Sequence, residues 1–76
     1  MGTRQWQGRL EKGPLGPGIW KLEADDGRAY QLVGDIPARL EGKRVVVTGE
    51  RDGLLGLAVL AGVIRVEQIR EEGGWR

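Results

Sequence analysis

The side chains most often used for covalent and acid–base catalysis are absent from this chain. Its 76 residues include no His, Cys or Ser, which removes the commonest general base and the two commonest nucleophiles. His and Cys are also the ligands of most structural zinc sites. The remaining carboxylates fall in expected turns and on expected outward faces, where nothing in the sequence would raise a pKa. We therefore expect a non-enzymatic protein that needs no cofactor.

One group of carboxylates has a spacing that could hold a metal ion. Asp25 and Asp26 are adjacent and Asp35 follows further on, and hard oxygen ligands of this kind bind Ca²⁺ or Mg²⁺. A calcium loop supplies more ligands at regular spacing, and none is evident here. Gly27 follows the pair between two alternating stretches, and Asp-Gly in that setting is the strongest short-range signal for a β-hairpin. We favour the turn over a metal site.

A second group combines basic and aromatic side chains, which is the combination that binds single-stranded nucleic acid. Together with the loop at residues 12–18, the candidate contacts are Lys12, Lys21, Arg28, Tyr30, Arg44 and Arg51. These cations are interleaved with acidic residues and the net charge is only +1, so no long-range attraction of phosphate is expected. Trp20 shares its strand face with Leu22 and Ala24, and Tyr30 shares its own with Leu32, which favours the core as the place of both rings.

A third group is aliphatic. Residues 53–64 hold much of the chain's aliphatic content and are interrupted by Gly56. Burial with a period of two would hide only half of these side chains. The others would either cover an end of the domain or contact a second copy of the chain, and the sequence leaves both readings open. In a dimer, the interface would include Leu54, Leu55, Leu57 and Val59.

Short strands must position these groups, because fourteen glycines leave little room for long helices. The alternation of apolar and polar residues predicts five strands, at 4–11, 19–24, 28–33, 43–50 and 63–69. The second and third flank the Asp-Gly turn and should form a hairpin. The segment at 54–60 is either a short extra strand or an ordered loop. Trp6 shares a face with Leu10, and Ile69 is out of phase with its strand, which predicts a bulge.

The connections are short. Residues 35–40 have room for one helical turn, with Asp35 as its cap, Pro37 near its start and Gly42 after its end. Residues 1–70 should form a single domain. Residues 71–76 should form a flexible polar tail, in which Trp75 has no assigned role.

Three segments of the chain resemble a family of short, uncharacterised bacterial OB-fold proteins: residues 22–35, 42–49 and 63–69. In the second segment a glycine precedes three valines and another glycine follows, and a small barrel needs a residue without a β-carbon where a strand turns a corner. The resemblance implies a five-stranded, OB-like Greek-key barrel in which the usual helix is reduced to one turn. An SH3-like barrel is the alternative architecture. No activity is implied.

The resemblance makes single-stranded nucleic acid the leading ligand class by analogy of fold. The alternative is a protein-interaction module, or a homodimer that pairs through residues 54–63. No apolar segment typical of an export signal is present, and no segment is long enough to span a bilayer, so we expect a cytoplasmic protein with no membrane partner. The composition is thermophile-like, since Asn is absent and Arg outnumbers Lys.

Overall fold

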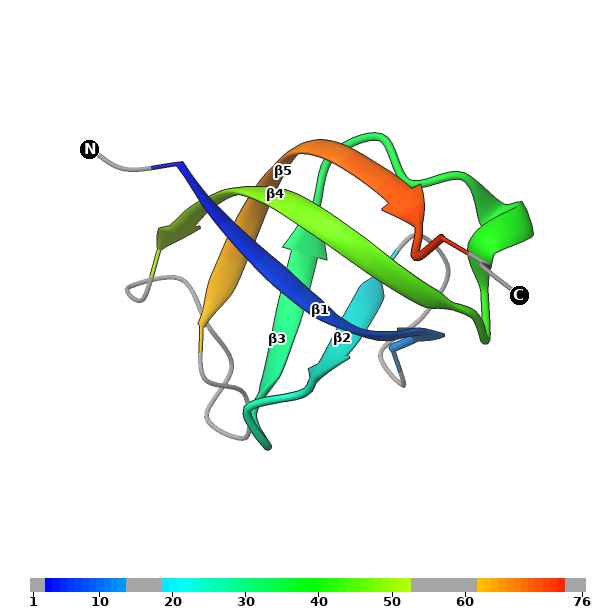
Figure 1. Ribbon diagram of the computed structural model, residues 1–76. Coiled ribbons are helices and arrows are strands. Elements are labelled where there is room, and N and C mark those ends of the chain that lie inside the picture. The colour runs from blue at the N-terminus through cyan, green and yellow to red at the C-terminus, as the bar shows by residue number, and fades with distance from the viewer. Residues whose placement is uncertain (1–2, 14–18, 53–61, 74–76) are drawn as a thin grey trace.

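A computed structural model of the protein describes residues 3–13, 19–52 and 62–73 (Figure 1). Its strands, in chain order, are β1 (Arg4–Lys12), β2 (Trp20–Ala24), β3 (Ala29–Val33), β4 (Arg44–Asp52) and β5 (Val63–Glu71). A single 3₁₀ turn, η1 (Ala38–Leu40), lies between β3 and β4. Each predicted strand is present, and the last one continues beyond its predicted end at residue 69.

The five strands form one closed sheet in the order β1-β2-β3-β5-β4, and β1 pairs with β4 to complete the ring. Neighbouring strands are antiparallel except β3 and β5, which run parallel. β5 thus lies between β3 and β4 although it follows β4 in the sequence. The ring confirms the prediction of a small all-β barrel with five strands and one helical turn, and the β2–β3 hairpin is confirmed with it.

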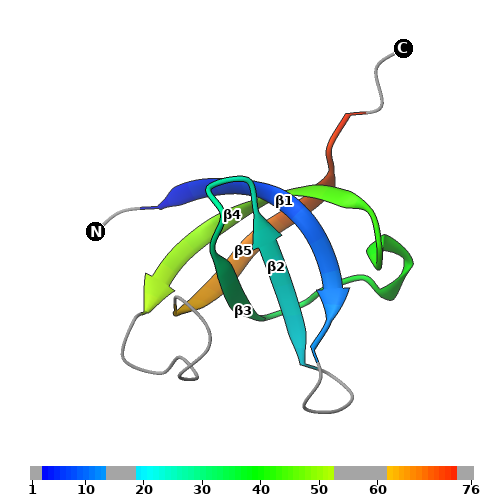
Figure 2. The ribbon, with the colours of Figure 1, turned by 90° about the horizontal axis from the view of Figure 1, so that it is seen from below.

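β1 reaches two neighbours because it is long and curved (Figure 2). Its first part, Arg4 to Arg9, pairs with β4, and its second part, Gly8 to Lys12, pairs with β2. β2 is much shorter and ends at Ala24, which lies opposite Gly8. The first residues of β1 therefore extend past the end of β2.

Inward-facing side chains from every strand fill the barrel. The buried core cluster contains Leu10, Trp20, Leu22, Tyr30, Leu32, Leu40, Val45, Val47 and Ile64. Successive side chains of a strand point to opposite faces of the sheet, so each strand contributes every second residue to this set. Trp20 and Tyr30 are 8% and 3% exposed, so both rings belong to the core, which was the favoured interpretation.

The turn η1 lies at one end of the barrel (Figure 1). Its Leu40 is fully buried in the core cluster, and Ile36 packs against that cluster. The prediction that Asp35 caps this turn is wrong. Pro37 occupies the cap position, and no side chain makes a capping hydrogen bond, because the extended backbone of Pro37 starts the turn too late for Asp35 to reach it. Gly42 follows with φ +80°, as expected for the residue that ends the turn.

The predicted bulge lies in β5, where this strand pairs with β4. Thr48 is opposite Gln68 but Gly49 is opposite Val66, so Glu67 is the extra residue. The shift of phase brings Ile69 to the same side as Val66, where both pack against the core. A β-carbon on Gly49 would overlap the carbonyl oxygen of Arg65, so this glycine is required by the close approach of two backbones.

Candidate functional site

Two of the predicted nucleic-acid contacts are already neutralised by carboxylates. The Lys21 ammonium lies 3.2 Å from a carboxylate oxygen of Glu23 and 3.7 Å from one of Glu11. The Arg44 guanidinium pairs with Asp25 and Glu72. Because these carboxylates offset the positive charge, neither cation is well suited to attract phosphate.

Tyr30 is not available as a stacking platform. Its ring lies in the core, and its hydroxyl donates a hydrogen bond of 3.1 Å to Asp26 Oδ2. The guanidinium carbon of Arg51 lies 5.9 Å from the ring centroid, at the range of a cation–π contact. Tyr30 and Arg51 therefore come together, but as packing at the rim of the core, where no base can reach the Tyr30 ring.

The other two predicted cations, Lys12 and Arg28, are both exposed but lie apart. Lys12 ends β1 opposite Trp20, the first residue of β2, whereas Arg28 follows the turn after the last residue of β2. The length of β2 thus separates them. Of the six predicted contacts, therefore, Lys21 and Arg44 are paired with carboxylates, Tyr30 lies in the core, and Lys12 and Arg28 lie at opposite ends of β2.

Several predicted residues lie outside the described residues. They are the remainder of the first loop, residues 14–18, the proposed interface residues Leu54, Leu55, Leu57 and Val59, and Trp75.

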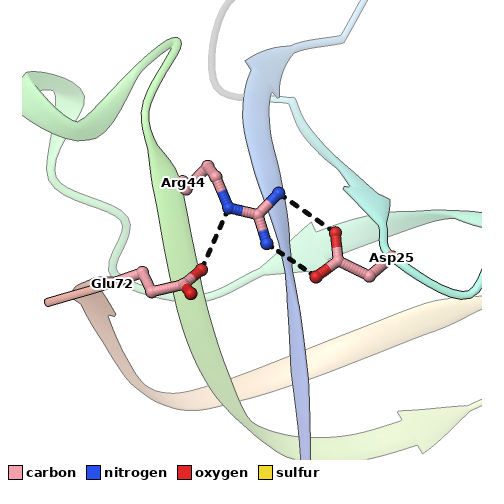
Figure 3. Close-up of polar contacts among 3 residues, drawn as sticks. All are labelled: Asp25, Arg44 and Glu72. Atoms are coloured by element: carbon pink, nitrogen blue, oxygen red, sulfur yellow. Dashed lines mark hydrogen bonds and ion pairs between the residues drawn. The ribbon is translucent and has the colours of Figure 1, made fainter.

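A three-residue ion-pair network, here called the Arg44 clasp, joins parts of the chain that are distant in sequence (Figure 3). Arg44 Nη1 and Nη2 donate to Asp25 Oδ1 and Oδ2 at 3.1 and 2.6 Å, and Arg44 Nε donates to Glu72 Oε1 at 3.1 Å. The planar guanidinium suits such a two-pronged contact. The clasp therefore ties the β2–β3 turn to the start of β4 and to the residue after β5.

The clasp also corrects the predicted C-terminal tail. Glu71 belongs to β5 opposite Val45, and the Glu72 N–H donates to the Arg44 carbonyl oxygen at 2.8 Å. The ordered chain thus continues past residue 70. The sequence alone could not show this, because the partner that holds Glu72 is far from it along the chain.

The Arg44 clasp should make stability depend on pH. The hydrogen bonds from Arg44, and its positive charge, lower the pKa of Asp25 despite some opposing desolvation, while Asp25 and then Glu72 raise the pKa of Arg44. Since folding lowers the pKa of Asp25, its contribution is present above the unfolded pKa of about 3.9. It is lost as the pH falls through the lower folded value.

We expect Arg44→Gln to flatten this part of the acid dependence. The measurement is the urea midpoint of unfolding at several pH values between about 5 and 2. Arg39→Gln, at an exposed residue of η1, is the matched control and should keep the wild-type slope. Equal slopes for wild type and Arg44→Gln would show that the clasp does not form in solution.

A cleft opens between the first part of β1 and the β2–β3 turn. Its volume is about 330 Å³, and it is lined by Gln5, Trp6, Gln7, Ala24, Asp25 and Asp26. It exists because β1 extends past β2. Just beyond the end of β2, the Asp25 N–H donates a hydrogen bond of 2.8 Å to the Gln7 carbonyl oxygen, and residues 4–6 of β1 lie further on. We call this feature the Trp6 cleft.

The lining of the Trp6 cleft is aromatic, polar and acidic. Trp6 is half-buried, and its ring centroid lies 6.0 Å from that of Tyr30 at an angle of 55°, so the core supports the indole. Asp26 accepts hydrogen bonds from the Arg28 N–H at 2.8 Å and from the Tyr30 hydroxyl. Both donors are uncharged and do not neutralise its carboxylate, whereas Arg44 does neutralise Asp25.

Sequence reasoning assigned Asp25 and Asp26 to the turn and Trp6 to the strand face that Leu10 shares, and it did not identify the cleft that they form. A usable signal was present. The predicted strand at 4–11 is longer than the one at 19–24, so one end of it must extend past its neighbour. Which end extends depends on the register, and the sequence does not specify the register.

The metal alternative gains no support from the geometry. Asp25 is held by Arg44, and Asp26 is held by the turn and Tyr30. Across the part of the chain that the structure describes, no three acidic residues gather in a way that could hold a metal ion. The same residues include no helix with the length and apolar character needed to cross a bilayer.

The fold and the cleft define a small all-β barrel with a polar, aromatic-walled cleft beside its β2–β3 turn. The chain belongs to the DUF5818 family, described as "Protein of unknown function", whose model matches residues 7–72. The match extends from the middle of β1 to the residue after β5 and so covers nearly the whole barrel. It confirms the expected membership of an uncharacterised family. No curated protein and no solved structure matches the chain.

Proposed function

We propose that this protein is a non-catalytic binding module that recognises a basic side chain of a partner protein in the Trp6 cleft. One observation carries the proposal: the lining combines an indole, two amides and two carboxylates with no Lys or Arg. The class of function is the protein-interaction alternative drawn from the sequence. The surface is different, because residues 54–63 are not involved.

Elementary electrostatics supports a cationic ligand. An ammonium or guanidinium over an indole face gains about 0.5–2 kcal/mol, depending on how far it is desolvated. A carboxylate beside it adds a charge-assisted hydrogen bond. Asp26 is held in place by the Arg28 N–H and the Tyr30 hydroxyl, so little of its side-chain freedom remains to be lost on binding. A phosphate in the same cleft would face the Asp26 carboxylate, whose charge its two hydrogen-bond donors leave in place.

The test is an amide NMR titration with two blocked peptides of alternating Thr and Val that differ only in a central Arg or Glu. We expect the Arg peptide alone to shift the amide signals of residues 5–7 and 24–26. Asp26→Asn should weaken its binding by about tenfold, because the loss of one charge-assisted contact costs about 1.5 kcal/mol. Asp35→Asn, an exposed carboxylate outside the cleft, is the matched control. The proposal is contradicted if wild type binds the Arg and Glu peptides equally well. It is also contradicted if Asp26→Asn binds the Arg peptide as tightly as wild type does.

Single-stranded nucleic acid remains the second candidate ligand, supported by the exposed cations Lys12 and Arg28. Among the described residues, no carboxylate lies within ion-pair distance of either. Mixed-sequence DNA and RNA in the same titration should then shift signals near these two residues, and binding should weaken steeply with salt because counterions are released. Dimerisation through residues 54–63 and a cytoplasmic location remain predictions.

A further inference from the structure

One edge of the sheet is open at the Trp6 cleft. β1 pairs with β4 from Arg4 onward, but its pairing with β2 begins only at Gly8. Figure 1 shows the first part of β1 running over β4, away from β2. In the described ranges, therefore, no strand pairs with residues 4–6 on the cleft side. Such an edge is a template for another chain, which barrels otherwise remove by closing.

The direction of the backbone groups follows from the hydrogen bonds. The N–H and C=O of a strand residue point to the same side and alternate from one residue to the next. Gln7 accepts from Asp25 on the β2 side, whereas Leu10, of opposite parity, bonds to Lys43 and Gly42 on the β4 side. Gln5, two positions before Gln7, must therefore direct its N–H and C=O into the cleft.

We infer that the basic partner segment binds as an added β-strand along residues 4–6. This inference rests on the proposed function and deepens it, because it specifies the backbone conformation of the partner. In strand addition, backbone hydrogen bonds supply affinity and the alternate side chains supply specificity. The residue across from Trp6 lies on the same face of the sheet, so its side chain meets the indole and the Asp26 carboxylate.

Charge complementarity identifies the occupant. No Lys or Arg lines the cleft, and its two charged residues are Asp25, which Arg44 neutralises from outside the lining, and Asp26, which keeps its negative charge. An added strand with a Lys or Arg across from Trp6, flanked by residues that point away from the cleft, would pair with the open backbone edge. Its basic side chain would at the same time complement the acidic lining. The recognised unit is thus a short extended segment with one inward basic residue. A second copy of this chain is not required.

Backbone methylation of the peptide separates strand addition from side-chain recognition alone. Two versions of the Arg peptide carry a single N-methyl group. In the first peptide, the methyl group replaces the hydrogen of a backbone N–H that would face β1. In the second peptide, it replaces the hydrogen of a backbone N–H that would face away from β1. We expect the first to bind about three- to tenfold more weakly than the second, which corresponds to the loss of one backbone hydrogen bond. Equal binding overturns strand addition but leaves the proposed function intact. If the unmethylated Arg peptide does not bind, both proposals fail.

A measurement on the protein gives an independent result. Hydrogen exchange of the Gln5 amide should be fast in the free protein and at least about tenfold slower with the Arg peptide, because a strand then covers it. Gln5→Pro removes this donor but no bond of the β1–β4 ladder, so the variant should keep the wild-type urea midpoint and lose the peptide. Unchanged Gln5 exchange with bound peptide overturns the inference, and that result does not depend on whether Gln5→Pro folds.

Discussion

Gly49→Ala is expected to prevent the barrel from closing properly. The new β-carbon would overlap the carbonyl oxygen of Arg65 and approach the Val66 Cα at 3.1 Å. Both obstacles are backbone atoms of β5 at the bulge, so no flexible side chain can move aside. Overpacking commonly costs about 1–3 kcal/mol, and a clash between two backbones belongs at or above the top of that range. A domain of this size has roughly 4–11 kcal/mol of total stability.

The measurement is urea unfolding followed by tryptophan fluorescence. We expect Gly49→Ala to unfold at a much lower urea concentration than wild type or to be unfolded without urea. Gly73→Ala is the matched control, because a β-carbon there meets nothing within 4 Å, and it should change stability by less than about 0.5 kcal/mol. Gly8→Ala, which would overlap the Glu23 carbonyl oxygen, should behave like Gly49→Ala. If Gly49→Ala unfolds at the same urea concentration as Gly73→Ala, β4 and β5 do not approach as closely as described.

Leu40→Ala should have the next largest effect. Leu40 is fully buried and is the residue through which η1 joins the core. Removing a buried leucine side chain costs about 2–5 kcal/mol, from lost transfer free energy and from the cavity that remains. A small barrel has few other side chains that could relax into the space, so we expect the upper half of that range.

Ile36→Ala is the control for Leu40→Ala, because Ile36 packs against the same cluster but is only partly buried. Its cost should be smaller, since it gives up less buried area. Thermal unfolding followed by circular dichroism would measure both. Equal losses for the two variants would contradict the assignment of Leu40 as the main contact between η1 and the core.

The sequence was most informative where the physics is local. Alternation placed every strand, Asp26-Gly27 predicted the hairpin, and the phase of Ile69 predicted the bulge. Each of these depends on residues that are neighbours in the chain. Asp35 shows the limit of local rules, because a residue suited to capping does not cap when Pro37 starts the turn later.

The candidate site was less predictable because it depends on contacts between distant residues. Whether Arg44 attracts phosphate depends on Asp25 and Glu72, which reach it only in the folded chain. The Trp6 cleft depends on which part of β1 lies beyond Ala24, and this is a matter of strand register. Composition identifies the residue types of a site, but the pairing of strands decides which of them meet.

The parallel pairing of β3 with β5 has a consequence for how the chain folds. β1, β2 and β3 are joined in sequence order by antiparallel pairing, and so are β4 and β5. The two remaining strand pairs, β1 with β4 and β3 with β5, join strands that are far apart along the chain. Neither the three-strand piece nor the two-strand ribbon encloses a core alone, so the entropy of closing long loops is lost before most burial is gained. In the transition state of folding, the β1–β4 and β3–β5 pairs should therefore both be partly formed. The barrel should assemble in one slow cooperative step rather than strand by strand.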